Sequence, residues 1–357
     1  MATGTATEPM PTLSDGSRET LRGIAESESG GKANILESES SNRTVVDLTP
    51  RRGNGQVEHN ELRKKELIEE NLDEATDAVS SLKASAAGMD LLEGISLAVH
   101  PYGDATNTQR TLMVISSGLS TRGALDLRQV TWQKDVKELV KELKSRDLLP
   151  PLPGWRVIFS GLGETAGGQP TLPQPIRNTL ERYWLGICTA SGAQSCSVDN
   201  SSRDEQPPRA TVSQPIIPVE EVVSVRGPHG KRKLIVSDSL LGFAGDSAVL
   251  PPSASSTVES VADKMVTQFG QDQQKSAIKV TGYTADPPGS TIAGCKRLSK
   301  QRADAVAEAL DKALREHGIS VRITADGGGI FKETSSIRNG KFDENQAAKM
   351  RRVEILY

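Results

Sequence analysis

The sequence of 357 residues has few aromatic side chains, few cysteines and no long apolar run. Phe, Trp and Tyr together make up 3% of the chain, and the net charge is -3, with both signs scattered along it. Proteins that bind nucleic acid usually combine a basic surface with aromatic side chains, so we expect no nucleic-acid partner. A membrane-spanning helix needs about 20 consecutive apolar residues, and no such run occurs.

Residues 1–14 lack the basic and apolar regions of a signal peptide. They also lack the apolar strand that normally precedes the first helix of a doubly wound domain, a helix that we predict from Asp15 to Glu28 with Ser14 as its cap. We therefore expect an N-terminally shortened form, and only the missing segment would carry an export signal or membrane anchor. The alternative is that Met1 is the true start of a cytoplasmic protein.

No catalytic constellation is recognisable. The four histidines lie in separate contexts, without a nucleophile motif nearby. Gly161-Leu-Gly163 follows a predicted strand, but the further glycine or lysine of a phosphate-binding loop is missing. We predict that the chain is not an enzyme and binds no cofactor.

Residues 1–199 alternate between apolar strand patterns and helical patterns. Leu112–Ser116 and Trp155–Phe159 are short continuous apolar runs, typical of strands buried on both faces of a parallel sheet. Helical periodicity precedes and follows each of them. The pattern predicts a doubly wound, Rossmann-like α/β domain.

Residues 200–232 are predicted to be a linker with a short β segment, because residues 200–218 are polar and rich in proline. Residues 233–357 then form a second, α+β domain. Its centre is the stretch Lys279-Val-Thr-Gly-Tyr-Thr-Ala-Asp286, a loop, and Leu298-Ser-Lys-Gln-Arg302. We expect a strand that ends near Gly282 and a helix that begins near Arg297.

Arg302 lies one turn before Val306 on the apolar stripe of that helix, so its guanidinium points toward the domain interior. A buried charge needs a partner. Either an intramolecular salt bridge neutralises it, or it belongs to a pocket for a ligand carboxylate, with Asp286 offering the opposite charge.

These motifs, together with the final Arg351-Arg-Val-Glu-Ile355, resemble the OmpA-like peptidoglycan-binding domain. That family includes outer-membrane protein A, the peptidoglycan-associated lipoprotein and flagellar-stator proteins. The resemblance covers residues 233–357 and implies a βαβαβ fold. It also implies that Asp286 and Arg302 hold the ammonium and carboxylate of diaminopimelate in the wall peptide. Thr284, Cys295 and Arg351 are possible secondary contacts.

Three positions depart from the family pattern. Ala285 takes the place directly after Thr284, Cys295 replaces an Asn before the Leu-Ser motif, and Met350 replaces an Asn before Arg351.

We expect a noncatalytic cell-envelope protein that binds peptidoglycan, located in the periplasm or at the wall. The alternatives are an OmpA-like interaction module that has lost wall binding, and an intracellular α/β regulatory protein.

The cysteines Cys188 and Cys196 are separated by a Gly- and Ser-containing stretch that reads as a flexible loop. Two free thiols are one interpretation. A disulfide is favoured because a wall-binding domain implies an oxidising compartment. Cys295 is then left single.

The N-terminal domain resembles a von Willebrand factor A-like fold. That family binds a metal with an Asp-x-Ser-x-Ser loop and a later Thr-Asp-Gly. The nearest sequences here are Gly4-Thr-Ala-Thr-Glu8 and Ser116-Ser117-Gly118, which provide few carboxylates for a hard cation. We predict a degenerate site without metal, and a domain that binds an unknown protein partner.

Overall fold

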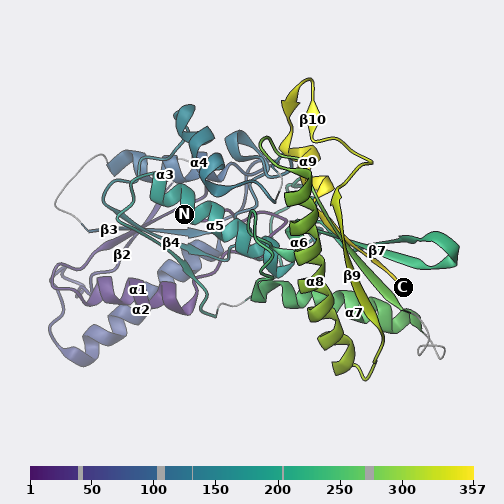
Figure 1. Cartoon of the computed structure of the whole chain (residues 1–357). Helices are drawn as coiled ribbons and strands as arrows, with labels where there is room; N and C mark the ends of the chain where they lie inside the picture. Colours follow the sequence, from purple (N-terminus) through teal and green to yellow (C-terminus); the bar gives the residue numbers. More distant parts are fainter. Residues whose placement is uncertain (39–42, 103–108, 131, 203–204, 270–276) are drawn as a thin grey trace. The chain divides into compact units, whose positions relative to one another are not determined.

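The computed structural model describes residues 1–38, 43–102, 109–130, 132–202, 205–269 and 277–357 (Figure 1). The chain divides into two compact units. Unit 1 contains residues 1–129, 135–172 and 180–218, and unit 2 contains residues 130–134, 173–179 and 219–357. Within the described residues, no helix combines the length and hydrophobicity needed to cross a membrane.

Unit 1 is a mixed α/β unit whose elements follow the predicted alternation. In chain order they are α1 (Asp15–Glu26), β1 (Lys32–Leu36), β2 (Arg43–Asp47), α2 (Glu61–Ser80), α3 (Leu91–Val99), β3 (Arg110–Ile115), α4 (Val136–Ser145), β4 (Trp155–Ser160), α5 (Gln174–Ala190) and β5 (Ser195–Asp199). Short 3-10 turns cover His100–Tyr102 and Gly123–Leu125. The first residues of α5, up to Thr179, belong to unit 2.

Strands β3, β4 and β5 form a parallel sheet in that order, and β1 and β2 form an antiparallel hairpin. Ala2 lies between the two groups, because it forms parallel bridges to both Glu37 and Ile115. The Ala2 amide donates to Leu36 O at 3.0 Å, and the Ile115 amide donates to Met1 O at 2.9 Å. The backbone order is thus β2, β1, residues 1–3, β3, β4, β5.

The core of unit 1 forms where apolar stripes meet this sheet. Helix α2 buries Ile68, Leu72, Ala75 and Val79, which recur at helical spacing. Figure 1 shows α1 and α2 on one side of β3 and β4, with α3 and α4 on the other. Helix α1 starts at the predicted residue because the Ser14 side chain accepts a hydrogen bond from the Ser17 amide.

A disulfide joins Cys188 to Cys196, with 6.2 Å between their Cα atoms. The loop predicted between them is short, since Cys188 belongs to α5, Cys196 belongs to the edge strand β5, and only residues 191–194 connect the two elements. The strand was not recognised because its sequence, Ser-Cys-Ser-Val-Asp, contains only one strongly apolar residue. Parallel pairing with β4 supplies the order that the local sequence does not suggest.

The prediction that residues 200–218 are a linker burying nothing is also corrected. Ile217 is completely buried. Its amide donates to Gln169 Oε1 at 2.8 Å, and its carbonyl accepts from Gln169 Nε2 at 3.0 Å. The buried isoleucine and the bidentate glutamine fix the end of this polar, proline-rich segment onto unit 1.

Unit 2 is also mixed α/β. Its elements are β6 (Val223–Arg226), β7 (Arg232–Ser237), α6 (Asp238–Leu241), α7 (Ser255–Phe269), β8 (Ile278–Thr284), α8 (Ile292–Glu316), β9 (Ile323–Ile330), β10 (Ile337–Arg338), β11 (Lys341–Phe342), α9 (Glu344–Met350) and β12 (Arg352–Leu356). Short 3-10 turns cover Pro228–Gly230 and Pro252–Ala254.

Five strands form one sheet in the order β6-β7-β12-β8-β9, in which only β8 and β9 are parallel neighbours. Strand β6 therefore extends the C-terminal sheet ten residues before Lys233, the predicted start of the domain. Gly327, Gly328 and Gly329 lie inside β9, where a register shift accompanies them. The shift is the irregularity that glycines inside a strand allow.

Helix α8 lies unusually close to the sheet. A Cβ built on Gly282 would lie 2.2 Å from Ser299 O, and one on Gly327 would lie 2.6 Å from Lys296 O. Only glycine, which has no Cβ, allows the helix backbone to approach so closely at these two positions.

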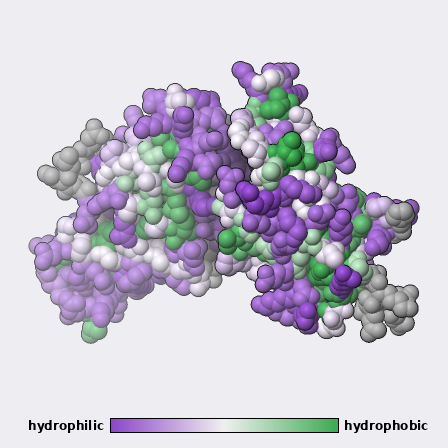
Figure 2. Space-filling model, in the orientation of Figure 1, coloured by the Kyte–Doolittle hydropathy of each residue, from purple (hydrophilic) through white to green (hydrophobic). Residues whose placement is uncertain are grey.

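On the face of the molecule drawn in Figure 2, hydrophilic and hydrophobic side chains are interspersed.

Candidate functional site

Helix α8 holds Arg302 inside unit 2. The helix starts at Ile292, five residues before the predicted Arg297, because Thr291 Oγ1 accepts a hydrogen bond from the Gly294 amide and caps it. The predicted stripe is confirmed: Val306 and Leu310 are buried, and the Arg302 residue is only 4% exposed.

The Arg302 guanidinium has four partners from residues 238–247. Its Nη1 lies 3.2 Å from both carboxylate oxygens of Asp238. Its Nε donates to Ser247 O at 2.8 Å, and its Nη2 donates to Ala244 O at 3.0 Å. The ring centroid of Phe243 lies 4.9 Å from the guanidinium carbon. The structure therefore contains the intramolecular salt bridge that was one of the two sequence interpretations.

Asp238 is the residue that sequence reasoning missed. Burial raises the pKa of its carboxyl, while the positive charges of Arg302 and Arg351 oppose that rise. A carboxylate in this environment is tolerable only with a close cation, and Arg302 is that cation. The two residues are 64 positions apart, so no local pattern could have linked them.

Asp286 follows the end of β8 and is half-buried. Its Oδ1 accepts a hydrogen bond from the Ser336 hydroxyl, which precedes β10. No other partner of this carboxylate occurs among the described residues. Thr284, two residues earlier, is 4% exposed, and its hydroxyl also has no hydrogen-bond partner in the described part of the chain.

The positions that depart from the family pattern share an environment. Ala285 and Met350 are both buried and belong to one apolar cluster with Phe331 and Ala347. Cys295 is a buried free thiol whose Sγ lies 3.7 Å from Ala285 O. Polar residues of the family pattern are therefore replaced by side chains that pack together.

Arg351 lies in a separate group of contacts. Its Nε donates to Gln133 Oε1 at 2.7 Å, and its Nη2 pairs with Glu344. The predicted ligand-binding residues thus divide by their contacts into three groups: Arg302 with Asp238, Asp286 with Ser336, and Arg351 with Glu344. Asp286 and Arg302 share no contact in the described residues.

In unit 1, Glu8 lies buried at the carboxyl ends of residues 1–3 and β3. Its Oε1 accepts from the Thr5 amide at 2.9 Å and from the Thr3 hydroxyl, and its Oε2 accepts from the Ser117 amide at 2.7 Å. The described residues contain no group of three or more His, Cys, Asp or Glu that could hold a metal. A hard cation needs more oxygen ligands than this single, already hydrogen-bonded carboxylate provides.

Comparison with known families identifies the C-terminal part of the chain. Residues 242–339 match the model of the OmpA family. Residues 242–339 therefore form an OmpA-like domain, which includes Arg302 and Asp286. No curated protein is significantly similar to the chain.

Several solved structures are similar to part of this chain. The cell wall anchor of the T6SS from Pseudomonas aeruginosa is 24% identical, with 38% of this chain and 85% of that chain covered and a TM-score of 0.29. The periplasmic domain of Helicobacter pylori MotB is 22% identical over 38% of this chain and 81% of that chain, with a TM-score of 0.29. The peptidoglycan-associated lipoprotein from Burkholderia pseudomallei is 22% identical over 34% and 88%, with a TM-score of 0.25.

Proposed function

We propose that this chain is a noncatalytic protein of the cell envelope whose OmpA-like domain binds the peptidoglycan stem peptide. The observation that carries the proposal is the match of residues 242–339 to the OmpA family. Two of the similar structures are named as a cell wall anchor and as a peptidoglycan-associated lipoprotein, which is the kind of role proposed here.

The ligand in this proposal is the zwitterionic residue diaminopimelate. Asp286 receives its ammonium group, because that carboxylate is half-buried and has only the Ser336 hydroxyl as a partner in the described chain. The neighbouring Thr284 hydroxyl supports the same position, since a buried hydroxyl without a partner favours a ligand that hydrogen-bonds to it.

Arg302 receives the carboxylate with the donor that remains to it. A guanidinium has five N–H groups. Nε donates to Ser247, Nη1 donates to both carboxylate oxygens of Asp238, and one hydrogen of Nη2 donates to Ala244. The second hydrogen of Nη2 therefore remains for a ligand. The first residue of α8 is ten positions before Arg302, about 15 Å along the helix at 1.5 Å per residue. The helix N-terminus and Arg302 are therefore too far apart to bind the same carboxylate, and in this proposal they bind different groups of a ligand. A helix that began near Arg297 would have brought both to one carboxylate.

The test is cosedimentation with purified wall sacculi. We expect the parent protein to pellet with sacculi and Asp286→Ala to remain largely in the supernatant, because the ammonium loses its only carboxylate. Asp304→Ala is the matched control: it removes an exposed aspartate of α8 whose one ion pair within the described residues is with Lys300. Equal pelleting of the Asp286→Ala and parent proteins would contradict the role of Asp286.

The second candidate function is an OmpA-like interaction module without wall binding. The ion pair between Arg302 and Asp238 and the apolar cluster around Ala285 and Met350 favour it. In this case the parent protein stays in the supernatant at every sacculus concentration, and the first proposal fails.

For unit 1 we propose a von Willebrand factor A-like fold with a degenerate metal site, presenting a surface to a protein partner. The strand order β2, β1, residues 1–3, β3, β4, β5 supports the fold. The hydrogen bonds of Glu8 to Thr3, Thr5 and Ser117 support the degeneracy, because they occupy the carboxylate that a cation would need.

A metal titration tests this degeneracy. Because ligands that bind only the folded state raise its stability, we expect millimolar Mg²⁺ or Mn²⁺ to leave the unfolding temperature of the full chain unchanged relative to Na⁺ at equal ionic strength. A rise with Mg²⁺ that Glu8→Gln removes would show that the site holds a cation.

A further inference from the structure

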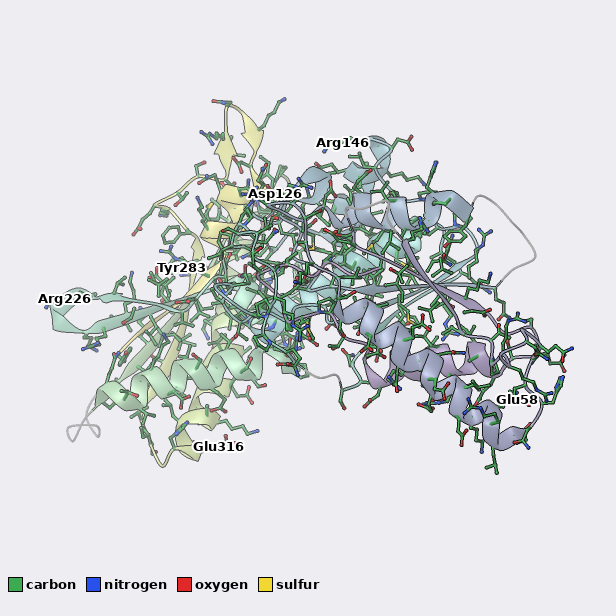
Figure 3. The ribbon with its side chains drawn as sticks, turned by 180° about the vertical axis from the view of Figure 1, so that it is seen from behind. Glu58, Asp126, Arg146, Arg226, Tyr283 and Glu316 are labelled. Atoms are coloured by element: carbon green, nitrogen blue, oxygen red, sulfur yellow. A yellow bond between two sulfur atoms is a disulfide. The ribbon has the colours of Figure 1, made fainter. Side chains whose placement is uncertain are left out.

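We infer that β6 is the interface through which two copies of this chain associate, edge to edge, about a twofold axis. Strand β6 is one edge of the five-stranded sheet and, among the described strands, pairs with β7 alone. The hairpin formed by β6 and β7 projects from the body of the sheet (Figures 1 and 3). All four residues of β6 are exposed, including Val223 at 50% and Val225 at 36%.

The backbone groups that face outward from β6 follow from its pairing. Arg232 exchanges both of its backbone hydrogen bonds with Tyr357, at 3.0 Å each, so these groups point away from β6. Arg226, the partner of Arg232, is therefore in a non-hydrogen-bonded pair, and its own N–H and C=O point to the free edge. By alternation the same holds for Ser224 and for Val222 just before the strand.

The strand at the opposite edge of the sheet, β9, is less suited to pairing with a strand of another molecule. Its pairing with β8 shifts register beside Gly282 and Tyr283, and Gly327–Gly329 interrupt its side chains. Strand β6 has a regular register and carries valines at alternate positions, which face the same side as their β7 partners Ile235 and Lys233.

The charge of Arg226 favours a second copy of this chain as the partner of β6, and it favours one register of the pairing. Arg226 has no carboxylate partner among the described residues and lies directly across from Arg232 on β7. Like charges in directly opposite positions are unfavourable, so a carboxylate arriving from outside would relieve this pair. Glu220 supplies such a carboxylate: it lies three residues before β6, and its Oε2 accepts a hydrogen bond from the Ser239 hydroxyl. If β6 continued as an extended strand through residues 220–222, Glu220 would lie on the same side as Arg226.

An antiparallel self-pairing centred on Val223 brings these groups together. It sets Val223 against its symmetry mate, Val222 against Ser224, and Glu220 against Arg226, with the last pair occurring twice. Directly opposite side chains in such a ladder have Cβ atoms about 5 Å apart. Centring on Ser224 instead would set Arg226 against Val222 and leave both arginines without a carboxylate. A second copy of this chain therefore carries the complement that β6 lacks.

The experiment is sedimentation equilibrium of the full chain over a range of protein concentrations, with Arg226→Glu and Glu220→Arg as variants. We expect a reversible monomer–dimer equilibrium for the parent protein. Each variant alone should raise the dissociation constant about tenfold or more, because two opposite-charge pairs become two like-charge pairs. An equimolar mixture of the two variants should form a heterodimer more tightly than either self-associates, since both of its 220/226 pairs are again opposite in charge.

A backbone control separates pairing from surface charge. Ser224→Pro removes one outward N–H without touching the bonds to β7, whereas Ser224→Ala keeps it. We expect the Pro variant to be monomeric and the Ala variant to dimerise like the parent, with both retaining the parent circular dichroism spectrum. A parent protein that remains monomeric at all concentrations, or a dimer indifferent to Arg226→Glu and Ser224→Pro, overturns the inference. Binding to an anionic polymer through the basic hairpin, in place of dimerisation, would overturn it as well.

Discussion

Replacing Arg302 with Ala is expected to lower the free energy of unfolding of unit 2 by about 3 to 5 kcal/mol, the range for removing one partner of a buried ion pair. The side chain of Arg302 is 5% exposed and that of Asp238 is 10% exposed. Truncation leaves the Asp238 carboxylate buried without its cation, and it also leaves Ala244 O and Ser247 O without their guanidinium donors. Loss of wall binding by this variant would therefore not by itself show that Arg302 touches a ligand.

Hydrogen exchange of β8 and β12 in the full chain measures the effect, because exchange of these central strands reports the opening of unit 2. Arg315→Ala is the control within the same helix: Arg315 is exposed and pairs with Asp311, so its loss should cost less than about 1 kcal/mol. Adding Asp238→Asn to Arg302→Ala should recover part of the loss, since the orphaned charge disappears. Equal costs for the Arg302 and Arg315 variants would contradict the buried pair.

The second large effect is expected at Gly282. Gly282→Ala should cost about 3 kcal/mol or more, at the upper end of the range for overpacking. The new Cβ would lie 2.2 Å from the backbone oxygen of Ser299, and a backbone atom cannot rotate away as a side chain does. Helix α8 would have to move off β8, and Arg302 would move with it.

Gly245→Ala is the matched control for this variant. Gly245 belongs to the same unit, and a Cβ there meets nothing within 4 Å, so the change should alter stability by no more than about 0.5 kcal/mol. The same exchange measurement on β8 compares the two variants. A Gly282→Ala protein as protected as Gly245→Ala would show that α8 is less tightly seated than its distance from Gly282 implies.

The sequence by itself determined the features that repeat at short range. The apolar stripe of α8, with Val306 and Leu310 after Arg302, predicted that Arg302 points inward, and burial confirms it. The continuous apolar runs predicted β3 and β4, and Ser14 predicted the start of α1. In each case the residues that decide the structure are neighbours in the chain, so their spacing is visible without a fold.

The OmpA-like resemblance of residues 233–357 also came from local motifs, because its strand, loop and helix follow one another in the chain. The family match covers residues 242–339. Local patterns were less reliable at boundaries. The cap at Thr291 started α8 five residues earlier than the Leu-Ser motif suggested. The short β segment predicted within residues 200–232 is β6, and its pairing with β7 makes it part of the C-terminal sheet, which therefore begins before the predicted boundary at Lys233.

Only the tertiary structure decided which groups meet. Asp238 reaches Arg302 across 64 residues, and Ser336 reaches Asp286 across 50. Neither pair has a spacing that any secondary structure would impose. The closeness of α8 to Gly282 and the free edge of β6 are likewise properties of the folded sheet. A charged residue on an apolar stripe indicates that a partner of opposite charge is needed. Which residue that partner is depends on the packing of segments that are distant in the sequence.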